Sequence, residues 1–219
     1  MSPRPRTVPD ADILFAAQRV MSRLGPARVT LADVAKEAGL APATLVQRFG
    51  SKRGLILAMW ADAVEGVEAC FQMLRPAHPS PLDAVIAAAT EMPRHTKSPE
   101  EMANHLAFLQ IDLSDPEFHR HMLEMSRRTE AGYRSLLDEA IGVGELKPCD
   151  TGRLARAISA LSGGSLISWA VFRRGTADTW VRDDLETLLG PYRGTARRGT
   201  RNARASRARR RGLPKAAAS

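Results

Sequence analysis

The sequence predicts an all-α protein with two parts, a small three-helix N-terminal domain and a larger helical C-terminal domain. Apolar residues recur at steps of three and four along most of the chain, which is the spacing of helices with one buried face. No stretch alternates apolar and polar residues at the period of two that a half-buried strand requires. Serine and proline followed by acidic residues also recur between the apolar stretches, in the combination that starts helices.

The first two helices of the N-terminal domain are marked by their ends. A first helix begins at Asp10, carries apolar residues at helical spacing and stops at Gly25-Pro26. Thr30 is a suitable N-cap for a second helix, with Asp33 three residues later to complete a capping box. Gly39 then ends that helix, because glycine readily adopts the left-handed conformation that a tight turn requires.

A short third helix follows the glycine turn. Pro42 occupies its first position, where a missing N–H costs no hydrogen bond, and the helix is expected over residues 42–48. Two helices joined by a tight turn at this spacing are typical of a helix-turn-helix, whose second helix lies in the major groove of DNA. The residues expected to contact DNA are Thr30, Ala43, Thr44, Gln47, Arg48 and Lys52.

These six residues have different expected roles. Thr44 and Gln47 can reach base edges, and Ala43 is a small residue near the exposed start of the recognition helix. The arginine of the set is expected to contact a guanine or a phosphate. Thr30 and Lys52 lie at the N-terminal ends of helices, where backbone N–H groups and the helix dipole favour phosphate.

The same stretch resembles the TetR family of one-component bacterial transcription regulators. The matching residues are Thr30, Ala38-Gly39-Leu40, Thr44-Leu45 and Phe49-Gly50-Ser51-Lys52-Arg53. Val46 and Arg48 depart from the family pattern, which usually has a phosphate-contacting Tyr at the first position and His or Tyr at the second. Ala41 replaces the usual Ser or Thr cap of the recognition helix. The resemblance implies repression of transcription that is relieved when a ligand binds.

The C-terminal domain is expected to begin with a long helix capped by Ser51. The apolar stripe of this helix includes Trp60 and Phe71, and Arg75-Pro76 ends it. Three further start signals combine serine, proline and an acidic residue. They predict helices over residues 81–92, 99–113 and 115–143, with N-caps at Ser80, Ser98 and Ser114.

Two helices are expected to close this domain, over residues 151–174 and 177–189. The first carries a bulky apolar stripe and a second stripe of small residues. Gly163-Gly164 lowers the helix propensity of this segment, which suggests tight packing across a subunit boundary. The resemblance places the dimer interface of family members on these two helices.

A small apolar effector is expected to bind among the central helices, because Met and aromatic side chains form adaptable walls. The residues expected to line this site are Trp60, Phe71, Met102, Phe108, Met122 and Met125. Packing in an ordinary hydrophobic core explains the same residues equally well.

The formal net charge of +8 is divided unevenly along the chain. Residues 57–192 have seven more acids than bases, whereas residues 193–219 hold ten basic residues and no acid. This tail is expected to be disordered, and it either adds sequence-independent affinity for DNA or is a solubilising extension. The arm formed by residues 1–9, with three prolines and two arginines, is open to the same two interpretations. The folded domains are therefore expected over residues 10–50 and 51–192.

Neither an enzyme nor a metal site is indicated. His119 and His121 point to different faces of a helix, and the other histidines have no partner at ligand spacing. Cys70 and Cys149 are interpreted as isolated thiols. No phosphate-binding loop, Rossmann fingerprint or nucleophile elbow occurs, so no cofactor is expected. Since neither a signal peptide nor a membrane-spanning run is evident, no membrane partner is expected and the predicted location is the cytoplasm.

The predicted function is ligand-responsive regulation of transcription. One short recognition helix contacts too few bases to specify a genomic site, so a homodimer is expected to bind a palindromic operator in double-stranded DNA. By the resemblance, the protein is a repressor that a small apolar effector releases. The alternative is a nucleoid-associated architectural protein that binds DNA through its basic tail.

Overall fold

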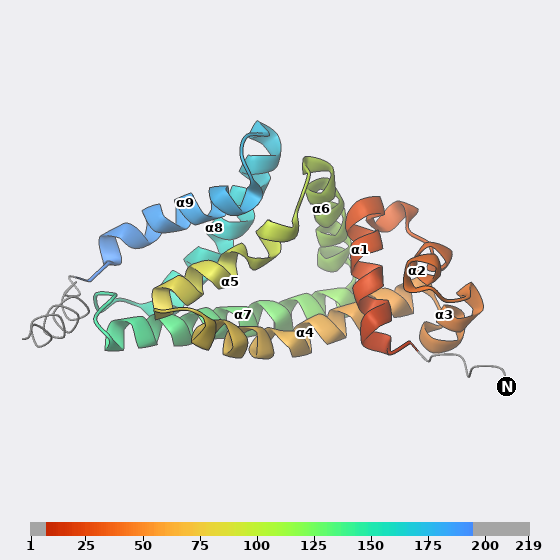
Figure 1. Ribbon diagram of the computed structural model, residues 1–219, viewed down its shortest axis with the longest axis horizontal. Coiled ribbons are helices and arrows are strands. Elements are labelled where there is room, and N and C mark those ends of the chain that lie inside the picture. The colour runs from red at the N-terminus through yellow and green to blue at the C-terminus, as the bar shows by residue number, and fades with distance from the viewer. Residues whose placement is uncertain (1–7, 195–219) are drawn as a thin grey trace, which may run out of the picture.

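Helices make up nearly all of the structure, a computed structural model that describes residues 8–194 (Figure 1). Within that range the chain forms nine α-helices and one 3-10 turn, and its β-type pairing is a single isolated bridge between Leu146 and Arg193. The predicted all-α fold is therefore confirmed. The helices are α1 (Asp10–Arg28), α2 (Leu31–Ala38), α3 (Pro42–Phe49), α4 (Lys52–Ala77), α5 (Pro81–His95), α6 (Pro99–Ser114), α7 (Pro116–Gly142), α8 (Thr151–Phe172) and α9 (Ala177–Leu189).

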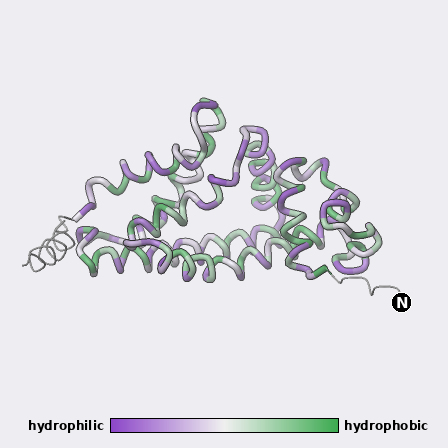
Figure 2. Tube along the Cα trace, in the orientation of Figure 1, coloured by the Kyte–Doolittle hydropathy of each residue, from purple (hydrophilic) through white to green (hydrophobic). Residues whose placement is uncertain are grey.

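The helices form an elongated molecule with α1, α2 and α3 at one end (Figure 1). The long helices α4 and α7 lie against each other and run from this end into the body of the molecule. Helices α5 and α8 pack on α7 at the far end, and α9 packs on α5 and α8. In Figure 2 apolar and polar residues alternate along each helix, so the polarity is divided between helix faces and not between regions of the chain.

The apolar faces meet in two separate cores. The N-terminal core joins α1, α2, α3 and the start of α4, with Ile13, Val34, Leu45 and Leu55 at its centre. It also takes in Phe118 from α7. The C-terminal core is larger, and its fully buried side chains include Val85, Leu137, Ile158, Val181, Leu185 and Leu189.

The predicted helix starts agree with the structure, with one correction. Thr30 and Asp33 form the reciprocal capping box, and Ser51, Ser80 and Ser98 each accept a hydrogen bond from a backbone N–H three residues later. The third predicted cap, Ser114, is instead the last residue of α6. Its hydroxyl donates to the Gln110 carbonyl, 2.8 Å away.

Asp115 caps α7 in place of Ser114. Its carboxylate accepts hydrogen bonds from the backbone N–H groups of Glu117 and Phe118. A carboxylate both fills the cap position and complements the positive end of the helix dipole, which the serine hydroxyl does not.

The first helix was predicted to stop at Gly25, but the chain becomes helical again after this residue and α1 ends at Arg28. The glycine has a φ of 74° and a ψ of 167°, which breaks the helix at this point. It also allows α6 to come close, because a Cβ atom here would lie 2.4 Å from the Asn104 side-chain oxygen. Asn104 donates a hydrogen bond of 2.7 Å to the carbonyl of Ser22.

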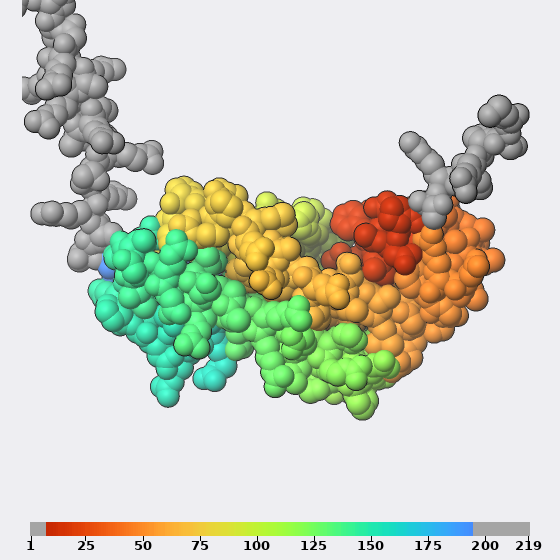
Figure 3. All heavy atoms as spheres, turned by 90° about the horizontal axis from the view of Figure 1, so that it is seen from below, coloured from red at the N-terminus to blue at the C-terminus, as the bar shows by residue number. Residues whose placement is uncertain are grey.

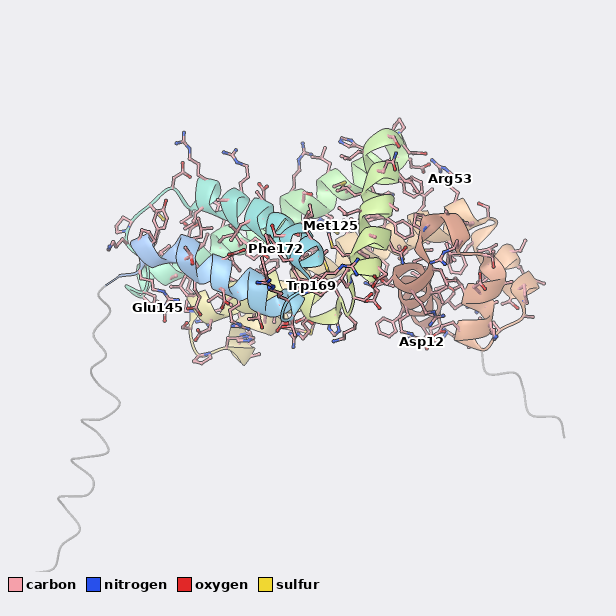
Figure 4. All side chains as sticks on the ribbon, turned by 90° about the horizontal axis from the view of Figure 1, so that it is seen from above. Asp12, Arg53, Met125, Glu145, Trp169 and Phe172 are labelled. Atoms are coloured by element: carbon pink, nitrogen blue, oxygen red, sulfur yellow. The ribbon has the colours of Figure 1, made fainter. Side chains whose placement is uncertain are left out.

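A second set of polar contacts joins the start of α4 to the start of α7. Arg53, at the start of α4, donates to Glu117 at 2.6 Å and to Asp115 at 2.9 Å (Figure 4). Its guanidinium also lies over the ring of Phe118, with its central carbon 5.1 Å from the ring centroid. The start of α7 is therefore held against the start of α4, next to the N-terminal core.

Helix α8 is the one described helix that is long and apolar enough to cross a membrane by length and composition alone. Core helices pass the same test, and α8 packs against α7, α9, α6 and α5. One third of its most apolar window is buried within the chain. Much of the apolar surface of α8 is therefore left uncovered by the rest of the described chain.

We expect Gly25→Ala to destabilise the protein by roughly 2–4 kcal/mol, because it combines a strained backbone with a clash against Asn104. Gly39→Ala is the matched control. Gly39 also has a positive φ, of 70°, but a Cβ atom there would meet nothing within 4 Å. Its loss should be roughly 1 kcal/mol. Urea unfolding measures both values, and equal losses would contradict the close packing described for Gly25.

Candidate nucleic-acid interface

Helix α3 presents a polar face on the outside of the N-terminal domain. Leu45 is completely buried and fixes the helix to α1 and α4. Ala43 and Gln47 are exposed, and Thr44 is half-buried beside them. Because residues 43, 44 and 47 lie on neighbouring positions of one helix face, the structure brings the predicted base-reading residues together.

Val46 belongs to the same surface but was not among the predicted contacts. Its side chain is 51% exposed, which is unusual for a β-branched apolar residue in a short helix. The sequence signal was present, since Val46 interrupts an otherwise polar face. An apolar side chain in the major groove can contact the methyl group of thymine.

Thr30 is exposed at the start of α2, but its hydroxyl is already occupied. It donates to the Asp33 carboxylate at 2.6 Å and accepts from the Asp33 backbone N–H at 3.2 Å. The Thr30 hydroxyl and backbone N–H both hold the pKa of Asp33 below its usual value. The helix start is therefore preorganised by the capping box and not open for an additional anion.

The two predicted cationic contacts, Arg48 and Lys52, are engaged within the protein. Arg48 donates to the carbonyl of Val8 at 2.6 Å and to the carboxylate of Asp10 at 3.1 Å. Lys52 donates to the Pro26 carbonyl at 2.5 Å. These contacts brace α3 and α4 against the two ends of α1, so the structure does not place either cation with the exposed group on α3.

The six residues predicted to line an effector site do not meet in one place. Trp60 and Phe108 pack against the N-terminal core, whereas Phe71 and Met102 belong to the C-terminal core. Met102 is buried, and Met122 and Met125 are half-buried on α7. The two groups lie on opposite sides of the junction between the domains.

Phe71 has a clear structural role. Its ring packs edge-on against Tyr133 with the centroids 5.3 Å apart. It also fills the space above Gly132, where a Cβ atom would lie 2.5 Å from the ring. Phe71 therefore sets the close approach of α4 to α7.

A groove of about 590 Å³ lies between α4 and α7, on the face shown in Figure 3. Phe71 is the one member of the predicted set that lines it. Arg75 on α4 pairs with Glu139 on α7 at its wall, and Arg128 donates to the Val64 carbonyl. Both arginines of the lining are therefore engaged within the protein, and Glu68, a third charged group of the lining, accepts a hydrogen bond from Gln72.

A buried polar group that sequence analysis missed lies near Trp60. Asp112 on α6 is 3% exposed, and one of its carboxylate oxygens has no hydrogen-bond partner among the described residues. The indole nitrogen of Trp60 and Nδ1 of His105 are also buried without partners there. Burial raises the pKa of Asp112 to about 6, and the approach of the Trp60 indole opposes that rise. The signal in the sequence was an acidic residue one turn after Phe108 on an apolar helix face.

Comparisons with known proteins agree with this architecture. Residues 13–59 match the model of the family described as bacterial regulatory proteins, tetR family. The chain is 28% identical over 158 residues to the HTH-type transcriptional regulator BetI of Agrobacterium fabrum, covering 71% of this chain and 73% of the relative.

Two solved structures show how widely the fold is shared. One is a transcriptional regulator from Saccharomonospora viridis in complex with choline, with a TM-score of 0.67, 19% identity, and coverage of 84% of this chain and 97% of the other. The other is FadR from Bacillus subtilis in complex with stearoyl-CoA, with a TM-score of 0.58, 16% identity, and coverage of 82% and 97%.

The helix-turn-helix geometry, the family match over it and the shared all-helical body agree on one assignment. By these comparisons the chain is similar to TetR-family transcriptional regulators, which are DNA-binding proteins and not enzymes.

Proposed function

We propose that the protein is a repressor that binds a palindromic operator as a homodimer and leaves it when a small effector binds. The observation that carries this proposal is the exposed face of α3, where Ala43, Thr44, Val46 and Gln47 surround a helix fixed by fully buried Leu45. A helix held this rigidly offers base contacts without paying to order them. In this proposal Arg48, Lys52 and Thr30 position the recognition helix, and each reaches phosphate only by exchanging its present partner.

The dimer is supported by the outer surface of α8. Ile167, Val171 and Phe172 are large apolar residues that are 44%, 72% and 61% exposed. A Cβ atom at Gly163 or Gly164 would meet nothing within 4 Å, so this surface is also shallow enough for another helix to approach. Since a palindrome has two-fold symmetry, the occupant that fits is a second copy of the same face.

The effector is proposed to act through the C-terminal domain, which comprises residues 51–192. Relatives of the same fold hold ligands as different as choline and stearoyl-CoA. Helix α4 carries both the last residues of the N-terminal core and one wall of the C-terminal core, so a ligand that tilts α4 also moves α3. Only a ligand that binds better to the DNA-incompetent state can release the operator.

The alternative, a nucleoid-associated architectural protein, rests on the basic residues 195–219, which lie outside the described residues. The described chain ends shortly after α9, at the opposite end of the molecule from α3 (Figure 1). Either function requires access to DNA, so we propose that the protein acts in the cytoplasm.

Selection of bound sequences from a random DNA pool should return one short palindrome. Thr44→Ala and Gln47→Ala should each relax the preference at individual bases, at roughly 1–3 kcal/mol per lost contact. Gln72→Ala is a matched control, because Gln72 is an exposed glutamine on α4, bonded to Glu68, far from α3. A pool without an enriched motif, or with an asymmetric one, would contradict the proposal.

Placing charge on the α8 surface should separate the dimer. Ile167→Glu would bury an unpaired carboxylate, and Gly164→Leu would hold the helices apart. Met73→Glu is the control, because Met73 is exposed on α4. Sedimentation at micromolar concentration should show monomers for the two α8 variants and dimers for wild type and control. A dimeric Ile167→Glu protein would place the interface elsewhere.

Removal of residues 193–219 should flatten the dependence of DNA affinity on salt while leaving the selected motif unchanged. The deleted segment holds ten basic residues, and each phosphate neutralised contributes nearly one unit to the log–log slope. Titrations at several salt concentrations measure the slope. The same slope in the truncated protein would mean that the tail does not touch DNA.

A further inference from the structure

Asp112 is a buried carboxylate without a cation. Asp112 is 3% exposed, yet among the described residues it forms no ion pair and no hydrogen bond to a charged side chain. The influences on its acidity are burial and the Trp60 indole, with no charged neighbour. Arg53, whose guanidinium lies near the start of α7, is committed to Asp115 and Glu117. Buried charges in proteins are normally paired, so this one is unusual.

No positive charge balances the carboxylate of Asp112 in its described surroundings. The indole N–H of Trp60 approaches the carboxylate, but it forms no hydrogen bond of ordinary geometry among the described residues. A carboxylate has about four acceptor positions, so one neutral donor leaves it largely unsatisfied. Asp112 also lies in the last turn of α6, where the helix dipole is negative and no basic residue offsets it.

We propose that Asp112 and Trp60 bind an organic cation whose nitrogen carries alkyl groups, and that this cation is the effector. The carboxylate supplies the counter-charge and the indole supplies an aromatic surface that attracts cations. Phe108 and Ile111, on the same helix as Asp112, pack with Trp60 against the N-terminal core and provide the apolar contact.

The geometry favours this class of cation over two simpler ones. A divalent metal needs several oxygen or nitrogen ligands, and the described residues contain no cluster of three or more that could hold one. A primary ammonium carries three donors that all require acceptors. An alkylated ammonium needs few or no acceptors, so a single carboxylate beside an aromatic ring can satisfy it.

The same site is positioned to act on the DNA-binding end. About two turns of α6 separate Asp112 from the contacts of this helix with α1. There Asn104 donates to the Ser22 carbonyl, and Nε2 of His105 is 3.2 Å from the Ser22 hydroxyl. Since Asp112 is only 3% exposed, a cation can enter only if α6 shifts from its present packing. That movement displaces α1, whose buried residues share the N-terminal core with α2 and α3. This step rests on the proposed function.

Thermal unfolding of the full-length protein tests the site without DNA. At 10 mM, choline or benzyltrimethylammonium should raise the Tm by about 3–5 °C if its Kd is near 1 mM. The neutral isostere of choline, 3,3-dimethylbutan-1-ol, should raise it by less than about 1 °C, because it has the same shape without the charge.

Variants then assign the site to its residues. Asp112→Asn should weaken binding of the cation at least tenfold by calorimetry, while remaining folded, because it removes only the uncompensated charge. Trp60→Leu should weaken binding similarly, and Trp60→Phe should retain most of it. Asp62→Asn is the matched control, since Asp62 is an exposed carboxylate on α4, and it should bind like wild type.

Three results would overturn the inference. These are no stabilisation by either cation, equal stabilisation by the neutral isostere, or undiminished binding to folded Asp112→Asn. A palindromic motif from DNA selection together with any of these results would leave the proposed function standing and remove only the cation site. Cation binding that leaves the affinity for the selected operator unchanged would overturn the effector role.

Discussion

The contact between α6 and α1 is the constraint on which the rest of the arrangement depends. It requires Gly25, because any side chain there would occupy the space of Asn104. Asn104 in turn satisfies the Ser22 carbonyl, which the broken helix would otherwise leave open. Through this contact the body of the protein holds α1, and α1 holds the recognition helix through the N-terminal core.

The second tie between the domains is electrostatic and joins the start of α4 to the start of α7. Arg53 forms this tie with two carboxylates, which hold its pKa above its usual value. These groups are largely exposed, so the tie adds orientation more than stability. Together the two ties leave α6 as the element whose displacement most directly reaches the DNA-binding end.

Local features were predictable from the sequence, because their causes are local. The capping box at Thr30, the left-handed turn at Gly39 and the serine caps of α4, α5 and α6 each depend on residues within four positions. The wrong cap at α7 arose where two candidates, Ser114 and Asp115, stood side by side, and only the length of α6 decides between them.

Features that depend on distant residues were not predictable. Arg48 was expected to face DNA, but its partners Val8 and Asp10 are about forty positions away in sequence and become neighbours only in the fold. Four of the six expected effector residues divide between the two cores, two to each, and Met122 and Met125 belong to neither, which no helical periodicity reveals. Asp112 was hidden for the same reason, because its significance lies in the absence of a cation among its described neighbours and not in its own identity.

Amide hydrogen exchange along α6, measured with and without the selected operator, tests the central claim that α6 couples the two domains. Coupling is reciprocal, so DNA binding at α3 must alter the stability of α6 as surely as movement of α6 alters DNA binding. We expect changed protection in α6 around Asn104, together with the end of α1, and unchanged protection in α5 and α9. Changes confined to α2 and α3 would contradict it.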